Sequence, residues 1–320
     1  MAKRGAPTPV TADNFRRAET DTTFVALAKQ GGFGKLTHRR DLASIDDHSV
    51  IRQNRDTLYS FGVFDLDAGP VTIAMPKADK RYMALQVIDE DQYSPAVYFD
   101  AGAYKLERKK IGTRYVATAI RTFVDPNDPK DVAKAHALQD SIEIAQTGKG
   151  KLELPDWDPE SQAKVRDALL ALAATLKDFG NAFGARDEVD PVHHLIGTAA
   201  GWGGNPPKAA VYESFLPEKN DGKTVHKLVV KDVPVDGFWS VTVYNARGFF
   251  EKNKLNAYSL NNVTAKKSKD GSVTIQFGGG DSKTPNLLPI MKGWNCTVRL
   301  YQPRKAIIDG KWKFPEPTEA

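Results

Sequence analysis

The chain has 320 residues, of which 41% are hydrophobic and 27% charged, and its formal net charge at pH 7 is +5. This length predicts two domains, although one large β domain is also compatible with it. Basic and acidic residues are both plentiful and interspersed, which favours solubility over nucleic-acid binding, and no apolar run approaches transmembrane length.

The single cysteine, Cys296, excludes an intramolecular disulfide and a cysteine-based zinc site. It lies in a segment that alternates like a strand, so we expect a small buried hydrophobic residue rather than a nucleophile. The N-terminus lacks an apolar signal region. The chain as given is therefore expected to be cytoplasmic, or periplasmic if a leader has been removed from it.

Residues 1–45 predict an N-terminal arm followed by one helix. The first 11 residues are rich in proline, alanine and threonine, which is typical of a loose arm. Thr11 to Asn14 offer N-cap residues for a helix that runs to about Gln30 and ends at Gly31. The expected apolar stripe of this helix is Phe15, Ala18, Thr22, Val25 and Ala26.

Residues 46–125 predict an N-terminal β domain. Aromatic and β-branched residues alternate there in short runs that are separated by turn residues. The expected strands cover residues 57–66, 71–75, 82–88, 96–99 and 114–123. Short strands at this spacing are typical of an antiparallel sandwich or barrel.

Residues 126–205 predict a helical connecting region. One helix is expected from Asp128 or Pro129 to about Ala145. A second starts at Pro159 with Asp158 as its N-cap, and a third covers Val192 to Thr198 after Pro191. The expected apolar face of the second helix, which is predicted to reach Gly180, is Val165, Leu169, Leu172, Ala173 and Leu176.

Residues 206–320 predict a C-terminal β domain. Its expected strands cover residues 211–215, 224–230, 238–244, 272–277 and 295–301. A long polar excursion separates the third strand from the fourth, and loops of this length inside a compact domain are often functional. Lys266 to Lys269 form a basic cluster before a turn at Asp270-Gly271, which we interpret as a solvated hairpin tip, with a phosphate-binding patch as the alternative. The predicted fold class is mainly β with a helical insert, consisting of two antiparallel β-sandwich or jelly-roll-like domains bridged by helices.

Several short stretches carry a resemblance to a known family: residues 54–60, 65–66, 69–70, 81–82, 86–89, 238–241, 253–259, 270–272, 286–289, 299–301 and 309–312. In this order, from about residue 45 to 317, the chain resembles the bacterial family that pairs domain of unknown function 1254 (N-terminal) with domain of unknown function 1214 (C-terminal). Two positions depart from the family pattern, since Ala257 stands where arginine is expected and Leu287 where tryptophan is expected. The resemblance implies two β domains joined by helices and says little about chemistry.

The first candidate site is the run from Asn54 to Thr57, which precedes a strand. Arg55 supplies a fork for a carboxylate, Asp56 a base or metal ligand, and Asn54 and Tyr59 further hydrogen-bonding groups. The alternative is structural: an Asx-type cap and a buried ion pair that fix the entry of the strand.

A second group of candidates lies at the end of the strand around residue 88 and in the third helix. Asp89 adjoins further acids and Tyr93, so it is a candidate acid or base, with a solvated turn as the alternative. His194 is a candidate base, with a satisfied core or capping histidine as the alternative. We also expect Asp56 and Asp89 to be neighbours, because successive antiparallel strands often pair.

The third group lies in the excursion after residue 244. Tyr244, Arg247, Asn256 and Tyr258 combine aromatic, cationic and amide groups, which suit a sugar-like or other polar organic ligand. A loop that satisfies its own hydrogen bonds is the alternative.

These patterns favour a protein that binds a small polar organic molecule, with hydrolase or lyase turnover by carboxylate acid–base chemistry as an extension. The motifs of serine hydrolases, P-loop nucleotide-binding proteins and zincins are missing from the sequence, which leaves open whether the protein is an enzyme. The alternatives are a non-catalytic assembly module and a metal-dependent enzyme that uses Asp56, Asp89 or His194. No cofactor is predicted, nucleic-acid and membrane partners are not expected, and a homo-oligomer is left open.

Overall fold

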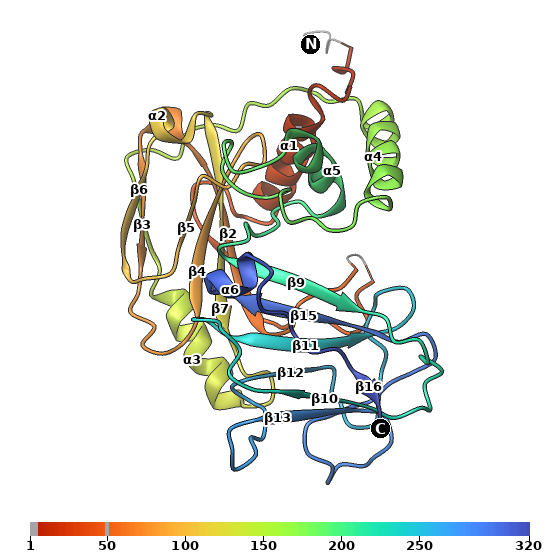
Figure 1. Ribbon diagram of the computed structural model, residues 1–320. Coiled ribbons are helices and arrows are strands. Elements are labelled where there is room, and N and C mark those ends of the chain that lie inside the picture. Colours follow the sequence, from red (N-terminus) through yellow and green to blue (C-terminus); the bar gives the residue numbers. More distant parts are fainter. Residues whose placement is uncertain (1–5, 49–50) are drawn as a thin grey trace. The chain divides into compact units, whose positions relative to one another are not determined.

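The architecture is mainly β, with helices inserted between the strands (Figure 1). The structure, a computed structural model, describes residues 6–48 and 51–320. In those residues sixteen strands form four sheets and six α-helices are distributed along the chain. The mainly β fold class predicted from the sequence is therefore confirmed. Within the described ranges, no helix combines the length and apolar composition needed to span a bilayer.

The chain divides into two compact units, and each is assembled from separated stretches. Unit 1 comprises Met1–Arg40, Tyr59–Thr122 and Lys134–Pro207, and unit 2 comprises Asp41–Leu58, Phe123–Ala133 and Lys208–Ala320. Two short stretches from the N-terminal half of the sequence thus belong to the unit that contains the C-terminal residues.

The first 207 residues hold most of the helices and eight of the strands. The helices are α1 (Phe15–Lys29), α2 (Arg108–Ile111), α3 (Pro129–Asp140), α4 (Pro159–Ala173) and α5 (Pro191–Ala200), with a short 3-10 helix at Leu66–Ala68. The strands are β1 (Thr37–Arg39), β2 (Thr57–Asp65), β3 (Val71–Met75), β4 (Met83–Asp89), β5 (Ala96–Tyr98), β6 (Gly102–Leu106), β7 (Tyr115–Phe123) and β8 (Glu143–Gln146).

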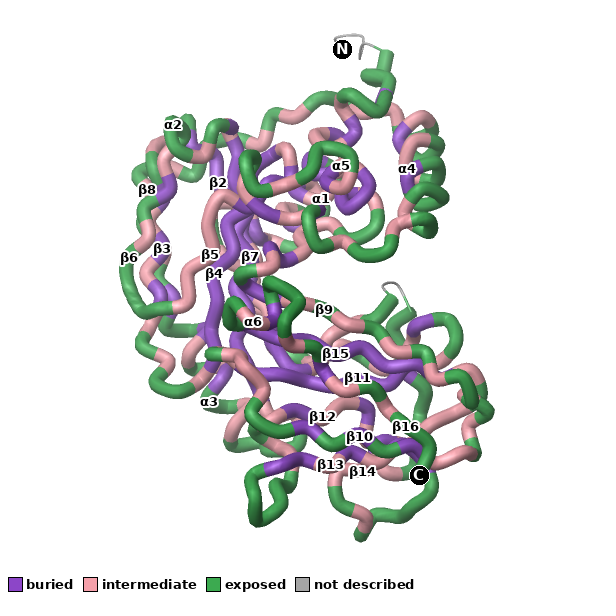
Figure 2. The backbone as a smooth tube through the Cα atoms, in the orientation of Figure 1, coloured by how far each residue is buried: buried purple, intermediate pink, exposed green. Residues whose placement is uncertain are grey.

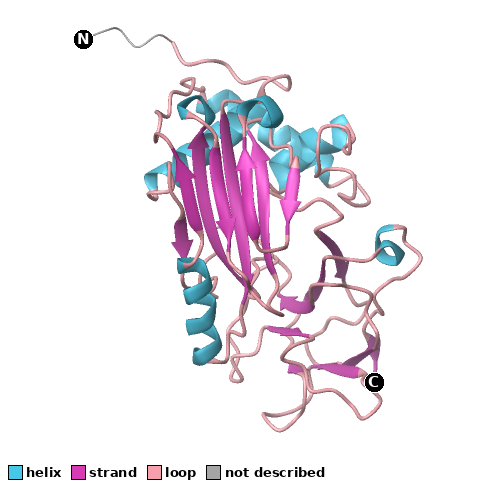
Figure 3. Ribbon diagram, turned by 90° about the vertical axis from the view of Figure 1, so that its left-hand side faces the viewer, coloured by secondary structure: helices cyan, strands magenta, loops and turns pink. Residues whose placement is uncertain are grey.

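Unit 1 is built around a five-stranded sheet with the order β1-β2-β7-β4-β5 (Figure 3). Its central strands β4 and β7 are buried along their whole length (Figure 2). One face packs on the three-stranded sheet β6-β3-β8 through a core that includes Phe64, Ile73 and Leu85. The other face packs on α1 through Phe24 and Leu27. This sandwich with a helical cover explains why both faces of the central strands are buried.

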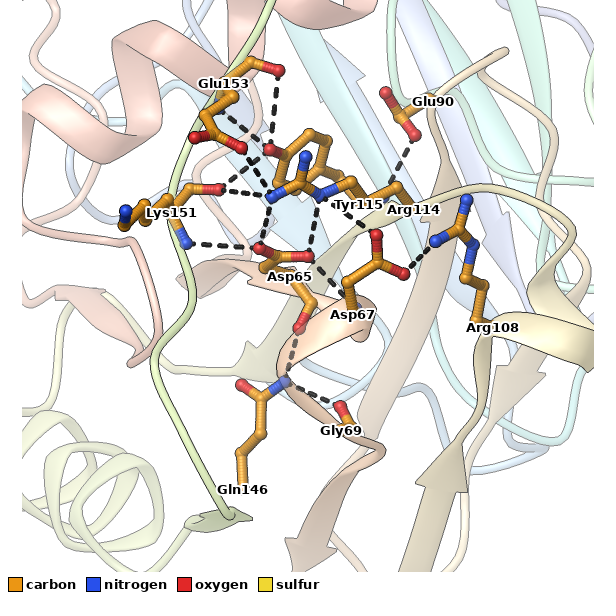
Figure 4. A network of polar contacts seen from close by, with 10 residues as sticks. All are labelled: Asp65, Asp67, Gly69, Glu90, Arg108, Arg114, Tyr115, Gln146, Lys151 and Glu153. Carbon is orange, nitrogen blue, oxygen red and sulfur yellow. Dashed lines mark hydrogen bonds and ion pairs between the residues drawn. The ribbon is translucent and has the colours of Figure 1, made fainter.

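A polar network closes one end of this sheet, where β2 ends and β7 begins (Figure 4). The Arg114 guanidinium donates to both carboxylate oxygens of Asp65, at 3.0 and 2.9 Å, and the Lys151 backbone N–H donates to the same carboxylate at 3.1 Å. Burial of Asp65 would raise the pKa of its carboxyl, but the hydrogen bonds from Arg114 and Lys151 outweigh it, so the pKa lies below its usual range. The network therefore fixes the 146–153 segment against the sheet.

Unit 2 contains the remaining strands and one short helix. They are β9 (Ala210–Phe215), β10 (His226–Val230), β11 (Trp239–Tyr244), β12 (Ser259–Asn261), β13 (Val273–Phe277), β14 (Leu287–Leu288), β15 (Asn295–Tyr301), α6 (Lys305–Ile308) and β16 (Thr318–Glu319). Two four-stranded sheets, β14-β13-β10-β16 and β12-β11-β15-β9, form a sandwich. Its core includes Trp239, Val241, Ile275, Phe277 and Val298.

Cys296 lies in this core and is fully buried, which confirms the buried role predicted for it. Burial raises the pKa of its thiol to about 12. The thiolate that a nucleophile requires is therefore scarce at neutral pH.

Several predicted helices differ from those observed. Helix α1 buries Phe15, Ala18, Phe24 and Leu27, so the expected stripe through Thr22 and Ala26, which are exposed, was wrong beyond its first turn. The helix ends at Lys29 before Gly31, whose φ of 88° requires glycine or a strained residue.

The helix expected to reach Ala145 ends at Asp140, and β8 follows directly. Ile144 of β8 pairs with Ile73 of β3, so sheet pairing outweighs the local preference for helix at this point. The helix that begins at Pro159 is capped by Asp158 as predicted, but it ends at Ala173, and Leu172 is 51% exposed instead of buried.

Candidate functional site

The sheet β12-β11-β15-β9 of unit 2 has one apolar and one polar face, and both are buried. Apolar residues of β11 and β15 point into the sandwich core, and the alternate positions carry polar side chains. These polar residues are Ser240, Thr242 and Tyr244 in β11 and Asn295, Thr297, Arg299 and Tyr301 in β15. All seven have at most 5% of their surface exposed. Buried polar groups need partners, and residues 51–58 of the same unit supply many of them.

Arg299 is the centre of this polar face. Its guanidinium donates to Thr242 Oγ1 at 2.9 Å, to the Arg52 carbonyl at 2.7 Å and to Tyr244 Oη at 2.7 Å. Burial would lower the pKa of Arg299, but the neighbouring Tyr244 and other groups outweigh it, so the residue stays a cation.

Two side chains of residues 51–58 attach this segment to β15. Asn54 Nδ2 donates to Tyr301 Oη at 2.8 Å and to Thr57 Oγ1 at 3.0 Å. Arg52 Nη1 donates to Asn295 Oδ1 at 2.9 Å and to Thr297 Oγ1 at 3.0 Å. Tyr244 Oη adds a bond to the Gln53 carbonyl at 2.7 Å. Polar contacts of Arg52, Gln53 and Asn54 thus hold the segment on the sheet.

Asp56 differs from the other residues of the segment because only half of its carboxylate is used. The side chain is 1% exposed, and its Oδ1 accepts from Ser259 Oγ at 3.0 Å and from Asn261 Nδ2 at 3.4 Å. Among the described residues, Oδ2 has no hydrogen-bond partner. Ser240 Oγ, on the residue that pairs with Asn261 across β11 and β12, also lacks a partner among them. An unpartnered buried carboxylate oxygen is costly, so a native protein keeps one for a reason.

Arg55 lies beside Asp56 and is half-buried. Its guanidinium lies over the rings of Tyr258, at 5.6 Å, and Phe250, at 5.9 Å, and it donates to the Ala43 carbonyl. Burial lowers the pKa of Arg55, which nevertheless stays a cation. We call Asn54, Arg55, Asp56, Ser259 and Asn261 the Asp56 cluster. Asn54, Arg55 and Ser259 are its half-buried rim, and Asp56 and Asn261 are its buried floor.

The loop after β11 is only partly involved in this cluster. Tyr244 and Tyr258 are buried with Phe250 beside it, whereas Arg247 and Asn256 are exposed. The Asn253 side chain accepts from the N–H groups of residues 255 and 257 and donates to the carbonyl of residue 257. Around Asn256 the loop therefore satisfies its own hydrogen bonds, as the alternative interpretation expected.

The other predicted residues belong to unit 1. Asp89 Oδ1 accepts from the N–H groups of Asp91 and Tyr93, both at 2.9 Å, and this closes a turn in which Gln92 has a φ of 69°. Burial raises the pKa of Asp89 to about 7, against the opposing effect of these hydrogen bonds. The carboxylate has the right pKa for a general acid, but its geometry is that of an Asx turn.

His194 lies fully buried in α5 and is occupied on both ring nitrogens. Nδ1 lies 2.8 Å from the Ala182 carbonyl and Nε2 lies 3.1 Å from the Asp91 carbonyl. The ring stacks on Tyr93 with 4.2 Å between centroids. Burial lowers the pKa of His194, against the opposing effect of the two carbonyl groups. It connects α5 to the turn after β4 and offers no free nitrogen to a substrate.

Tyr59, the last predicted residue, also belongs to unit 1, where its ring lies 5.5 Å below the Arg121 guanidinium. The expectation that Asp56 and Asp89 are neighbours rested on pairing between β2 and β4. That pairing does not occur, because β7 lies between these strands in the sheet. Within the described residues, no three His, Cys, Asp or Glu side chains form a group that could hold a metal ion.

Two buried ionisable residues, one in each unit, were not identified from the sequence. Arg299 was assigned only to a strand, although β15 carries polar residues at every second position and so predicts a polar face. Asp21 of α1 was also missed: it is 1% exposed, and burial raises the pKa of its carboxyl to about 7, although the Trp157 indole N–H donates to it at 2.8 Å. Its position on the buried face, three residues after Ala18, was the available signal.

Two family models match this sequence in the order expected from the resemblance. The model described as "Protein of unknown function (DUF1254)" matches residues 33–98, and the model described as "Protein of unknown function (DUF1214)" matches residues 217–305. The chain thus pairs a DUF1254 region with a DUF1214 region. No curated protein matches it in sequence.

Two solved structures resemble this DUF1254–DUF1214 protein. The VPA0106 protein from Vibrio parahaemolyticus is 20% identical, with a TM-score of 0.70 over 96% of this chain and 98% of that one. A putative uncharacterized protein from Burkholderia cenocepacia is 14% identical, with a TM-score of 0.54 over 97% of this chain and 88% of that one. At these identities the likeness shows the fold alone.

The Asp56 cluster draws on both halves of the DUF1254–DUF1214 pair. Asn54, Arg55 and Asp56 lie within the DUF1254 match, whereas Ser259 and Asn261 lie within the DUF1214 match. All five nevertheless belong to unit 2. The cluster therefore requires both parts of the family sequence.

Proposed function

We propose that this protein binds a small polar organic molecule at the Asp56 cluster, with Asp56 Oδ2 as the acceptor for a donor group of the ligand. The observation that carries the proposal is the half-used carboxylate of Asp56, which is 1% exposed. Ser259 and Asn261 hold Oδ1 and so orient the carboxylate, and Oδ2 keeps its acceptor capacity. This is the arrangement of a preorganised recognition group.

The other two predicted catalytic residues support the choice of Asp56 by contrast. Asp89 uses its Oδ1 to close its own turn, and His194 has a carbonyl against each ring nitrogen. His194 therefore has no free ring nitrogen, and Asp89 is committed through Oδ1 to its own turn.

The rim of the cluster favours a particular ligand chemistry. A group that reaches Oδ2 must donate a hydrogen bond, as a hydroxyl or an amine does. The half-buried Arg55 guanidinium next to it can accept a carboxylate or another acceptor-rich group. A hydroxyl-rich or hydroxy-carboxylate compound satisfies both, and a turnover reaction would use Asp56 as the general base for the donor's proton.

An assembly role for this region is the competing function. It would require an apolar patch beside the loop, where Ile51 and Val263, 57% and 60% exposed, are large apolar side chains among the described residues. Isolated exposed apolar side chains are ordinary on soluble proteins, so they do not favour an interface over a ligand site.

Thermal unfolding of the full chain against sugars, hydroxy acids, simple carboxylic acids, esters and divalent cations tests the proposal. A ligand that binds only the folded state stabilises it by about 2.7 kcal/mol at 100 times its Kd, which should raise Tm by about 5 °C. We expect the shift with a hydroxyl-bearing compound.

Two charge-matched variants make the result specific. Asp56→Asn keeps the shape of the side chain but replaces the acceptor oxygen, so it should abolish the shift. Glu251→Gln removes one negative charge from an exposed position of the same unit and should leave the shift unchanged. A shift that survives in Asp56→Asn would contradict the proposed site, and no shift with any compound would favour the assembly role instead.

A further inference from the structure

Unit 2 contains a second feature that the Asp56 cluster does not use, a hollow of about 210 Å³ at one end of the sandwich. It lies where β10 ends and where β11 and β13 begin. Its lining includes Val230, Lys231, Asp232, Trp239, Lys267 and Val273.

Side chains of the sandwich core lie beneath this hollow. Val230, Trp239 and Val273 are 4%, 5% and 3% exposed and belong to the sandwich core. Trp239 is held by an edge contact with Phe314, with 5.5 Å between ring centroids. Val233 and Val235, which also line the hollow and are half-buried, are the apolar side chains that a ligand can reach.

The rim is charged. Lys231 and Lys267 line it as exposed side chains, and within the described residues neither ammonium group lies within ion-pair distance of a carboxylate. Asp232 lines the rim too, and Asp270 is close enough to Lys231 for the lysine to lower its pKa. The Asp270 carboxylate is already engaged by the hydroxyl and N–H of Ser272, at 2.7 and 3.1 Å. The two ammonium groups are therefore available to an anionic ligand, beside the Asp232 carboxylate.

From this combination we propose that the hollow is a binding site for a small carboxylate with an apolar body. The body lies on Trp239 and the valines, and the carboxylate lies between Lys231 and Lys267. At about 20–30 Å³ for each non-hydrogen atom, the volume of about 210 Å³ accommodates roughly seven to ten such atoms. Benzoate is of that size and serves as the probe. The inference is independent of the Asp56 cluster.

NMR titration of the full chain with benzoate, followed at the tryptophan indole N–H signals, tests the inference. We expect saturable binding with Kd on the order of 1 mM, as suits a ligand this small. Benzyl alcohol, which lacks the charge, should bind about tenfold more weakly, and benzylamine should not bind more tightly than benzyl alcohol.

The lysine cluster offers a matched control. The double variant Lys231→Gln with Lys267→Gln should weaken benzoate binding at least tenfold. The double variant Lys266→Gln with Lys269→Gln removes the same charge from exposed neighbours that do not line the hollow, and it should stay within about twofold of wild type. Melting temperatures of both variants establish that they are folded.

Three results would overturn the inference: no saturable binding of benzoate to wild type, equal weakening in the two lysine variants, or tighter binding of benzylamine than of benzoate. Asp56→Asn should bind benzoate as wild type does. Loss of benzoate binding in that variant would assign the carboxylate to the Asp56 cluster and also count against a separate site.

Discussion

Buried carboxylates of this protein differ in what their oxygens contact, and this difference decides their roles. Asp56 and Asp65 are 1% and 2% exposed. Asp65 is engaged on both oxygens by Arg114, whereas Asp56 Oδ2 has no partner among the described residues. Equal burial therefore accompanies a structural role in one case and, in our proposal, ligand recognition in the other.

Asp21 provides a prediction about pH. Its folded-state pKa of about 7 lies above the ordinary value of 3.8, so the folded protein binds a proton that the unfolded chain releases. The associated stability is fully present below pH 4 and is lost as the pH rises to about 7. Asp21→Asn removes this dependence and should be more stable than wild type at pH 8, by up to about 4 kcal/mol.

Urea unfolding of wild type and Asp21→Asn at pH 4.5 and pH 8 measures this effect. The advantage of the variant should be small at the lower pH and large at the higher one. An equal difference at both pH values would show that the charge of Asp21 is not the cause.

Sequence reasoning at the residue scale identified polar residues but not their partners. Asn54, Arg55 and Asp56 were selected together, and the structure places them in one cluster with residues about 200 positions further along the chain. Arg299 was not predicted as a site residue because a lone arginine in a strand is usually exposed. Its burial depends on the segment that covers it, which local patterns do not encode.

At the scale of elements, local signals predicted most boundaries where capping or turn residues are explicit. The Asp158-Pro159 start of α4 was predicted, and the side chain of Asp158 does accept from the N–H groups of Glu160 and Ser161. Strand β8 was predicted as helix because its pairing with β3 is non-local. Short strands such as β12 and β14 were missed for the same reason.

The cap of α4 gives a direct prediction at this scale. Asp158→Ala leaves two N–H groups of the first turn without a partner and should lower the free energy of unfolding by about 1 kcal/mol. Asp158→Asn retains an acceptor and should lose only a few tenths of a kcal/mol. Chemical denaturation measures both, and an alanine variant as stable as wild type would exclude a role for the cap.

The polar network at the end of β2 gives a second prediction at the scale of elements. Asp65→Asn replaces a carboxylate oxygen that Arg114 and Lys151 contact and should cost about 2–4 kcal/mol. Asp67→Asn is the control within the same network, since the carboxylate of Asp67 is 40% exposed, pairs with the exposed Arg108 and lies 3.4 Å from Arg114 Nε. It should change stability by at most about 1 kcal/mol. Similar losses in the two variants would contradict the importance of burial for this network.

At the scale of the whole molecule, the units do not follow the order of the sequence. Residues 41–58 and 123–133 belong to unit 2 although they lie far from its main stretch. The order of the DUF1254 and DUF1214 regions in the sequence therefore predicts two β domains. It does not predict which segments of the chain belong to each of them.

This interleaving predicts the behaviour of fragments. A fragment of residues 206–320 lacks the Arg52 and Gln53 carbonyls and leaves the polar face of β11 and β15 without many of its partners. It should fail to unfold cooperatively, whereas the full chain should show a clear transition. A cooperatively folded 206–320 fragment, with dispersed amide signals in NMR, would contradict this account of unit 2.

The most direct test of the proposed site compares Asp56→Asn with wild type in thermal unfolding, alone and with the ligand that stabilises wild type most. No described residue donates a hydrogen bond to Asp56 Oδ2, so replacing this oxygen by an amide group removes no hydrogen bond. The free energy of unfolding of the variant alone should therefore lie within about 1 kcal/mol of the wild-type value or above it. The variant should also lose the ligand-induced shift. A variant destabilised by about 2–4 kcal/mol, as expected for Asp65→Asn, would show that Asp56 is a structural acceptor and would contradict its role in binding.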